Sequence, residues 1–240
     1  MANYVATPKK FLIEKLNKKC IKFEQCYLNK RVWLIYPYLF KYFLGNNKFN
    51  KINHPFFGKI LETKNSLFIK NNITSPNAAI QTEIVSILKS TQVIQFGIAG
   101  SIVNNLKIGD LIITKGAINE TGTGKIYGYP FDKIINSDKD LSQELMLQIK
   151  CKKIKFANEF HWCTDAPFEE TLDKIKKYRN MNGVCVEMEA AGIFCAALKY
   201  NIPSTGIYII SDELSVSGEW LQGWNSQLTI NTVKKIIEIF

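Results

Sequence analysis

The sequence contains few of the residues that metal sites and nucleic-acid interfaces most often use. Its two histidines are His54 and His161, and no two of its six cysteines form a C-x-x-C pair, so we expect no metal site. Only two of its 31 basic residues are arginines, whereas nucleic-acid binders cluster positive charge and read base edges with arginine. The net charge of +10 therefore predicts solvated lysine faces and no nucleic-acid partner, with a weak attraction for anionic substrates as the alternative.

The sequence also lacks a long hydrophobic run. Its longest apolar and aromatic stretch covers only residues 32–44 and includes Pro37 and Lys41, so we expect no membrane-spanning helix. The charged N-terminal segment has no continuous apolar core, which argues against a signal peptide. Hydrophobic residues make up 46% and charged residues 22% of 240 residues. These values predict one globular domain over residues 1–240, located in the cytoplasm, with no membrane partner.

From about residue 60 onward, short apolar strands alternate with amphipathic helices. The expected strands cover residues 66–70, 93–96, 111–114 and 204–210. The expected helices cover residues 77–89, 141–150, 168–178, a part of 184–200, and 229–240. This alternation predicts an α/β fold, namely a three-layer α/β/α sandwich with a mostly parallel, twisted central sheet. Ligands of such sheets bind beyond the carboxyl ends of the strands.

A glycine-containing segment follows one of these strands. Gly97, Ile98, Ala99 and Gly100 come directly after residues 93–96 and predict a turn where the backbone can approach a ligand closely. The alternative is that a tight turn between strand and helix needs glycine for its own geometry. The segment lacks the third glycine of a dinucleotide-binding fingerprint, and residues 122–126 lack the Ser or Thr of a phosphate-binding P-loop.

Carboxylates gather at two further positions. Glu187 and Glu189 flank Met188 where a helix is expected to open, and a carboxylate can accept from both hydroxyls of a ribose. The alternative is that acids favour a helix start in any case. Ser211 and Asp212 follow the apolar strand 204–210. There, partial burial can make an acid a proton donor, and the alternative is a helix N-cap.

Four ordered segments carry a family resemblance over roughly residues 56–240. They are residues 74–80, residues 96–102 with 106–110, residues 186–191, and residues 209–212. Together they resemble the purine nucleoside and uridine phosphorylase superfamily, which includes the methylthioadenosine/adenosylhomocysteine nucleosidases. Residues 164–168, and residues 211–214 followed by Trp220, are similar to a subgroup called simply nucleoside phosphorylase.

The resemblance implies an enzyme that cleaves the N-glycosidic bond of a nucleoside without a cofactor. Met188 and Glu189 would contact the ribose, with Glu187 assisting. Asp212 would donate a proton to N7 of a purine, and Phe168 would pack on the base. Ser211 would belong to the substrate-binding residues, and Gly97, Ile98, Ala99 and Gly100 would line the side from which the nucleophile attacks. Relatives are dimers or hexamers, so a homo-oligomer is expected.

The departures from the family concern phosphate. The N-terminal Gly-Asp-Pro-x-x-Arg segment of the phosphorylases is missing, Gln95 takes the place of an arginine, and Ile98 that of a Ser or Thr. Arg31 and nearby lysines could replace these ligands of orthophosphate.

The nucleophile can be water or phosphate, and these departures slightly favour water. The alternatives are a uridine or modified-base phosphorylase and a non-catalytic nucleoside-binding protein. A nucleophilic Cys163 beside His161 is disfavoured.

Overall fold

Eleven strands form one mixed sheet in the computed structural model, which describes residues 4–214 and 217–240. The strands are β1 (Arg31–Ile35), β2 (Asn50–His54), β3 (Gly58–Glu62), β4 (Ser66–Lys70), β5 (Gln92–Ser101), β6 (Leu111–Glu120), β7 (Ile134–Asn136), β8 (Ala157–Thr164), β9 (Gly183–Glu187), β10 (Ser204–Leu214) and β11 (Trp220–Gln222). The α-helices are α1 (Pro8–Asn17), α2 (Pro37–Leu44), α3 (Ser75–Ile87), α4 (Gly122–Ile126), α5 (Lys139–Cys151), α6 (Leu172–Asn180), α7 (Ala190–Lys199) and α8 (Gln227–Ile237). Two short 3₁₀ helices cover Phe23–Cys26 and Pro167–Glu169.

Five of the strands close into a ring. β5 pairs with β10, β10 with β6, β6 with β8, β8 with β9, and β9 returns to β5. The ring closes because β5 is longer than its neighbour β1: their pairing ends at Phe96, and β9 pairs with β5 at Gly100 and Ser101 instead. β1 continues outward from β5 through β4, β3 and β2.

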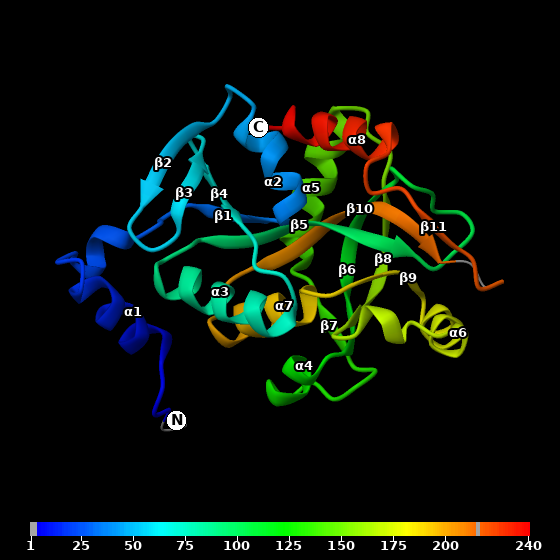
Figure 1. The fold of residues 1–240 in the computed structure, drawn as a ribbon, viewed down its shortest axis with the longest axis horizontal. Helices are drawn as coiled ribbons and strands as arrows, with labels where there is room; N and C mark the ends of the chain where they lie inside the picture. Colours follow the sequence, from blue (N-terminus) through cyan, green and yellow to red (C-terminus); the bar gives the residue numbers. More distant parts are fainter. Residues whose placement is uncertain (1–3, 215–216) are drawn as a thin grey trace.

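The α/β class is confirmed, whereas the mostly parallel three-layer sandwich is not clearly confirmed. Among the described residues, five of the strand pairings are parallel and six are antiparallel. Helices do cover two faces of the sheet: α2, α5 and α8 lie on one side, and α3, α4 and α7 lie on the other (Figure 1). Two large apolar clusters fill these two sides.

Two strands, β5 and β10, extend further than the sequence predicts, and both differences affect the site. The segment Gly97–Gly100 is not a turn, because β5 continues through it while pairing with β10. Likewise, β10 does not end at Ile210 but continues through Asp212 after a bulge. Both segments therefore belong to strands whose neighbours hold them in place.

The helix expected at residues 168–178 begins only at Leu172, and the segment 184–200 forms the end of a strand followed by a helix. The chain forms a short 3₁₀ helix at Pro167–Glu169 before α6, because a proline supplies no backbone donor and favours the first turn of a helix. Residues 183–187 become strand β9, and α7 begins only at Ala190. The two acids flanking Met188 thus stand at a strand-to-helix junction.

Candidate active site

A cavity of about 550 Å³ opens where the ends of β5, β9 and β10 meet. Nine of the ten residues expected at the site line it. They are Ile98, Ala99, Gly100, Phe168, Glu187, Met188, Glu189, Ser211 and Asp212. The same cavity is lined by aromatic residues that the sequence analysis did not assign to the site, namely Tyr36, Trp220 and Trp224. Tyr36 directly follows β1, so the rule that ligands bind past strand ends could have identified it.

Gly97 does not line the cavity, contrary to expectation. A Cβ atom at this position would lie 3.2 Å from the ring of Tyr208 and 3.3 Å from the amide nitrogen of Gln95. Gly100 has the opposite surroundings: a Cβ atom there would lie 2.6 Å from Leu214 and 3.0 Å from Oδ2 of Asp212. Gly100 therefore leaves the room that the carboxylate of Asp212 occupies.

Asp212 lies on β10, and both of its carboxylate oxygens have a donor. Ser211 Oγ lies 2.6 Å from Oδ1, and the indole nitrogen of Trp220 donates to Oδ2 over 2.8 Å. The alternative of a helix N-cap is wrong, because Asp212 stands inside a strand that pairs with β5 and β11. Trp220 thus fixes the orientation of a carboxyl group that is only 7% exposed at the cavity wall.

Glu189 is a buried carboxyl group that contacts the backbone amides of Thr74 and Met188. The amide of Thr74, a residue with a φ of +76°, donates to its Oε1 over 2.8 Å. Burial and the nearby charge of Glu187 raise the pKa of Glu189 to about 8. Its side chain does not cap α7, so for Glu189 the helix-start explanation fails.

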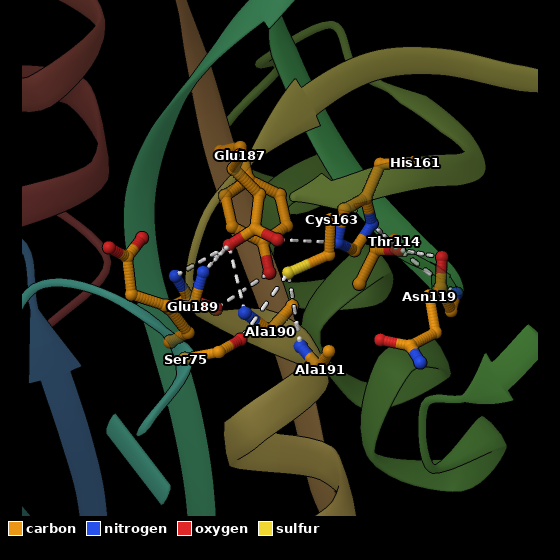
Figure 2. Close-up of polar contacts among 12 residues, drawn as sticks. Ser75, Thr114, Asn119, His161, Cys163, Glu187, Glu189, Ala190 and Ala191 are labelled. Atoms are coloured by element: carbon orange, nitrogen blue, oxygen red, sulfur yellow. Dashed lines mark hydrogen bonds and ion pairs between the residues drawn. The ribbon is translucent and has the colours of Figure 1, made fainter. Parts of the chain in front are cut away.

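For Glu187 the helix-start explanation holds. Its Oε2 accepts from the amides of Glu189 and Ala190, each over 2.9 Å, and from Gln95 Nε2 over 3.2 Å. Its Oε1 lies 3.2 Å from Nε2 of His161, as Figure 2 shows. Burial opposes ionisation of Glu187, but the contacts with His161, Cys163 and the amide of Glu189 lower its pKa. Glu187 therefore lines the cavity, but both of its carboxylate oxygens face groups inside the protein.

Cys163 is buried among the same groups. The amide of Ala191 donates to its Sγ over 3.4 Å, and Ser75 Oγ lies 3.7 Å away. Complete burial and the charge of Glu187 raise the pKa of this thiol well above its usual value. A nucleophilic thiol must ionise, so the contacts agree with the expectation that Cys163 is not a nucleophile.

The cavity wall carries acids and no cation. Its five acidic residues are Glu170, Glu187, Glu189, Asp212 and Glu219, and none of its described residues is Lys, Arg or His. Burial and the charges of Asp212 and Glu120 raise the pKa of Glu170 to about 8. Among its described residues, the wall therefore offers no positively charged side chain to bind an anion.

Arg31, which was expected as a possible replacement phosphate ligand, lies away from the cavity. Arg31 donates to both carboxylate oxygens of Glu144, over 2.7 and 2.8 Å, at the end of β1 that pairs with Gln92 of β5. The cavity lies at the opposite end of β5. Arg31 is therefore wrong as a phosphate ligand, because its charge is neutralised at a distance from the site.

Among the described residues, the structure shows no helix that is both apolar and long enough to cross a membrane. In the same residues, no group of three His, Cys, Asp or Glu side chains is arranged to hold a metal ion.

A model of the phosphorylase superfamily matches residues 44–240, so the chain belongs to the phosphorylase superfamily. A DeoD-type purine nucleoside phosphorylase from Mannheimia succiniciproducens is 28% identical over 165 residues, which cover 67% of this chain and 68% of the relative. A second, from Thermoanaerobacter, is 28% identical over 165 residues, covering 65% of this chain and 67% of the relative. The chain is thus an enzyme of the nucleoside phosphorylase and nucleosidase class.

Two solved structures share the fold. A purine nucleoside phosphorylase from Toxoplasma gondii, in complex with immucillin-H, superposes with a TM-score of 0.76 at 18% identity, covering 90% of each chain. An AMP nucleosidase from Bacteroides thetaiotaomicron gives a TM-score of 0.72 at 16% identity, covering 97% of each chain. At these identities the likeness concerns the fold alone.

Proposed function

We propose that this enzyme hydrolyses the N-glycosidic bond of a purine nucleoside, with water rather than orthophosphate as the nucleophile. In this proposal Glu189 and Met188 hold the ribose, Asp212 acts at the base, and Phe168 packs against the base from the mouth of the cavity. The single observation that carries the choice of water is the acidic wall, which has no cation among its described residues.

The reaction needs groups of the kind found here. Breaking the bond between ribose and base places positive charge on the sugar and negative charge on the base. A fixed carboxylate near the sugar stabilises the first charge, and a proton from an acid at the base neutralises the second. Glu189, at the start of α7, and Asp212, on β10, both line one cavity, and Glu189 would be the fixed carboxylate above its pKa of about 8.

Phosphate would be poorly held in this cavity. It carries roughly two negative charges at neutral pH, and burying it beside a sugar requires matched positive charge. Gln95 uses its amide for Glu187 and Tyr208, and Ile98 offers no hydroxyl donor. Water needs no counter-charge, so it fits this wall better.

A product assay tests the proposal. The protein is incubated with inosine, adenosine, guanosine and uridine, each with and without about 10 mM orthophosphate, which is above the usual range of KM values. We expect free purine base and ribose at equal rates in both conditions, and about 10²–10⁴-fold less from the D212N variant prepared identically, which controls for contaminating enzymes.

Each of the other possible outcomes contradicts one part of the proposed function. Ribose 1-phosphate formed with saturable dependence on phosphate would overturn the choice of water. Cleavage of uridine in preference to the purines would overturn the choice of base. Binding of nucleosides without any product would identify a non-catalytic binding protein instead.

A further inference from the structure

A chain of buried polar side chains lies directly beneath the ribose side of the cavity, and the proposed mechanism does not use it. It runs from Thr114 through His161 to Glu187, and from Glu187 through Gln95 to Tyr208 (Figure 2 draws its Thr114, His161 and Glu187 part). His161, Thr114 and Tyr208 have no exposed surface, and Gln95 is 1% exposed. Burying so many polar groups costs stability unless each one is satisfied, so their arrangement calls for an explanation.

The contacts of His161 place its ring between Thr114 and Glu187. Its Nδ1 lies 2.6 Å from Thr114 Oγ1, which also accepts from the amide of Gly116 over 2.9 Å and lies 3.0 Å from the carbonyl of Gly116. Its Nε2 faces Oε1 of Glu187 over 3.2 Å, and neither of these two buried atoms has a hydrogen-bond partner elsewhere among the described residues. An ionised carboxylate only accepts, so a proton shared across this contact would be carried by Nε2.

Glu187 is held as an anion from both sides. Three donors converge on its Oε2, namely Gln95 Nε2 and the amides of Glu189 and Ala190. Tyr208 donates to the amide oxygen of Gln95 over 2.8 Å, which turns the NH₂ group of Gln95 toward Glu187. At Oε1, His161 lies within ion-pair distance, and neither Oε1 nor Nε2 has a hydrogen-bond partner elsewhere among the described residues. Without His161, Glu187 would keep its three donors at Oε2 and the nearby thiol of Cys163, but it would lose the ring nitrogen that faces Oε1.

We propose that His161 is a positioning residue, which donates to Glu187, keeps it an anion, and thereby fixes the amides that begin α7 and the charge state of the ribose-facing carboxyl of Glu189. The proposal rests on the proposed function, since it takes Glu189 to be the ribose acceptor. The anionic Glu187 opposes a second charge on Glu189, whose pKa is about 8. Below that pH, Glu189 is protonated and offers less acceptor capacity to the two ribose hydroxyls. Riboside affinity should therefore rise as pH increases through about 8.

Glu170, on the same cavity wall, also has a pKa of about 8, so a parallel profile of E170Q is needed to separate its titration from that of Glu189. The thiols and phenols near the pair belong to Tyr36 (before α2), Cys163 (β8), Cys185 (β9) and Tyr208 (β10), and Asp212 lies across the cavity. Burial raises the pKa of each of the two thiols and the two phenols above its usual value. They are therefore neutral where Glu189 titrates.

The test measures how inosine affinity depends on pH between about 6 and 10, roughly two units on either side of the pKa of Glu189 of about 8, with 2′-deoxyinosine as the second ligand. In H161F the donor at Oε1 is lost, so Glu187 takes up a proton and no longer raises the pKa of Glu189. We expect the midpoint of the inosine profile to move down by about one to two pH units. In H161Q an amide donor remains, and the midpoint should stay within a few tenths of wild type (roughly the scatter of such titrations).

The other histidine provides a matched control. His54 is also buried and hydrogen-bonded, to the carbonyl of Cys26 and the amides of Phe56 and Phe57, but it does not line the cavity. The H54Q variant should change stability without moving the midpoint. If H161F does not fold, E187Q serves instead, because it removes the charge directly and should produce the same downward shift.

Infrared titration of the ligand-free protein separates this inference from the proposed function. The carboxylic acid band that is lost in E189Q reports protonation of Glu189 without any substrate. A midpoint near pH 8 in wild type that falls in H161F but not in H161Q supports the inference, even if no nucleoside is cleaved. Equal midpoints in wild type and H161F, or equal shifts in H161F and H161Q, would overturn it.

Discussion

At the scale of single residues, two neighbouring carboxylates differ in their pKa because different groups surround them. Glu187 accepts from two amides at the start of α7 and from Gln95, and its contacts with His161, Cys163 and the amide of Glu189 lower its pKa although burial opposes ionisation. Burial and the charge of Glu187 raise the pKa of Glu189, although it contacts the amides of Thr74 and Met188. Two acids that are only two positions apart can thus be held in different protonation states.

Removing the acid at Asp212 should affect the chemical step much more than folding. Asp212→Asn keeps an oxygen acceptor for Ser211 but cannot supply a proton to the purine. We expect kcat to fall by about 10²–10⁴-fold, the usual range for a lost general acid, with a melting temperature near that of wild type. A variant that keeps full specific activity per folded molecule would remove this role from Asp212.

Glu189→Gln should discriminate between sugars. At about pH 9, above the pKa of Glu189 of about 8, the lost carboxylate oxygen would accept from ribose, so kcat/KM for inosine should fall at least tenfold further than for 2′-deoxyinosine, about the value of one charge-assisted hydrogen bond. Parallel kinetics on the two substrates check this expectation. Equal losses would show that Glu189 does not contact the 2′ hydroxyl.

The same substitution should change how stability depends on pH. The pKa of Glu189 is raised from 4.5 to about 8 in the folded protein, so the folded state binds the proton more tightly than the unfolded state. The stability contributed by this group is complete below pH 4.5 and is lost as pH rises through 8. Urea unfolding should therefore show E189Q gaining stability over wild type between pH 5 and pH 8, and a constant difference would refute the raised pKa.

At the scale of elements, the site depends on the close approach of α3 and α7. A Cβ atom at Gly192 in α7 would lie 2.1 Å from the carbonyl oxygen of Ser75 in α3. That carbonyl belongs to the backbone and cannot rotate away. The two helices also meet through the bond from the amide of Gly192 to Ser75 Oγ, over 3.3 Å.

Gly192→Ala should therefore destabilise the protein, although alanine favours helices. We expect a loss of about 1–3 kcal/mol in the free energy of unfolding, as for other overpacked interiors, measured by chemical denaturation. The start of α3 carries the Thr74 amide that binds Glu189, so KM for inosine should rise as well. Gly45→Ala is the control, because Gly45 has an ordinary φ of −80° and the nearest atom to its added methyl group lies at 3.6 Å. A stable G192A variant would contradict the packing argument.

At the scale of the whole molecule, the surface and the cavity carry opposite charge. The chain has a net charge of +10, yet its cavity wall has five acids and, among its described residues, no cation. Long-range attraction brings anions toward the surface, but a buried phosphate group needs a partner at contact distance. The cytoplasmic location and the homo-oligomer stay predictions.

The enzyme should therefore discriminate against nucleotides, even though an AMP nucleosidase shares its fold. We expect AMP to bind roughly tenfold or more weakly than adenosine, since its 5′ phosphate would face carboxylates. Competition with inosine turnover at physiological ionic strength gives both inhibition constants. AMP binding as tight as adenosine binding would mean that a cation reaches the phosphate.

The sequence by itself determined which segments form the site. Local patterns were sufficient for β4, for the apolar part of β10 and for the polar residues after it, because burial of apolar side chains and strand periodicity are properties of short segments. The order of the four family segments pointed to the carboxylates, and the separate segment 164–168 pointed to Phe168. The prediction of a turn at Gly97 was wrong, because a glycine that follows an apolar segment is compatible both with a turn and with the interior of a long strand.

Tertiary structure alone decided how these segments act. Whether β5 ends at Gly97 depends on β9 and β10, which pair with it from distant parts of the chain. The division of labour between Glu187 and Glu189 depends on His161, Gln95 and Thr74, which reach them from β8, β5 and the start of α3. No local pattern records these contacts, because hydrogen bonds and charge interactions between strands are set by distance in space and not by spacing in sequence.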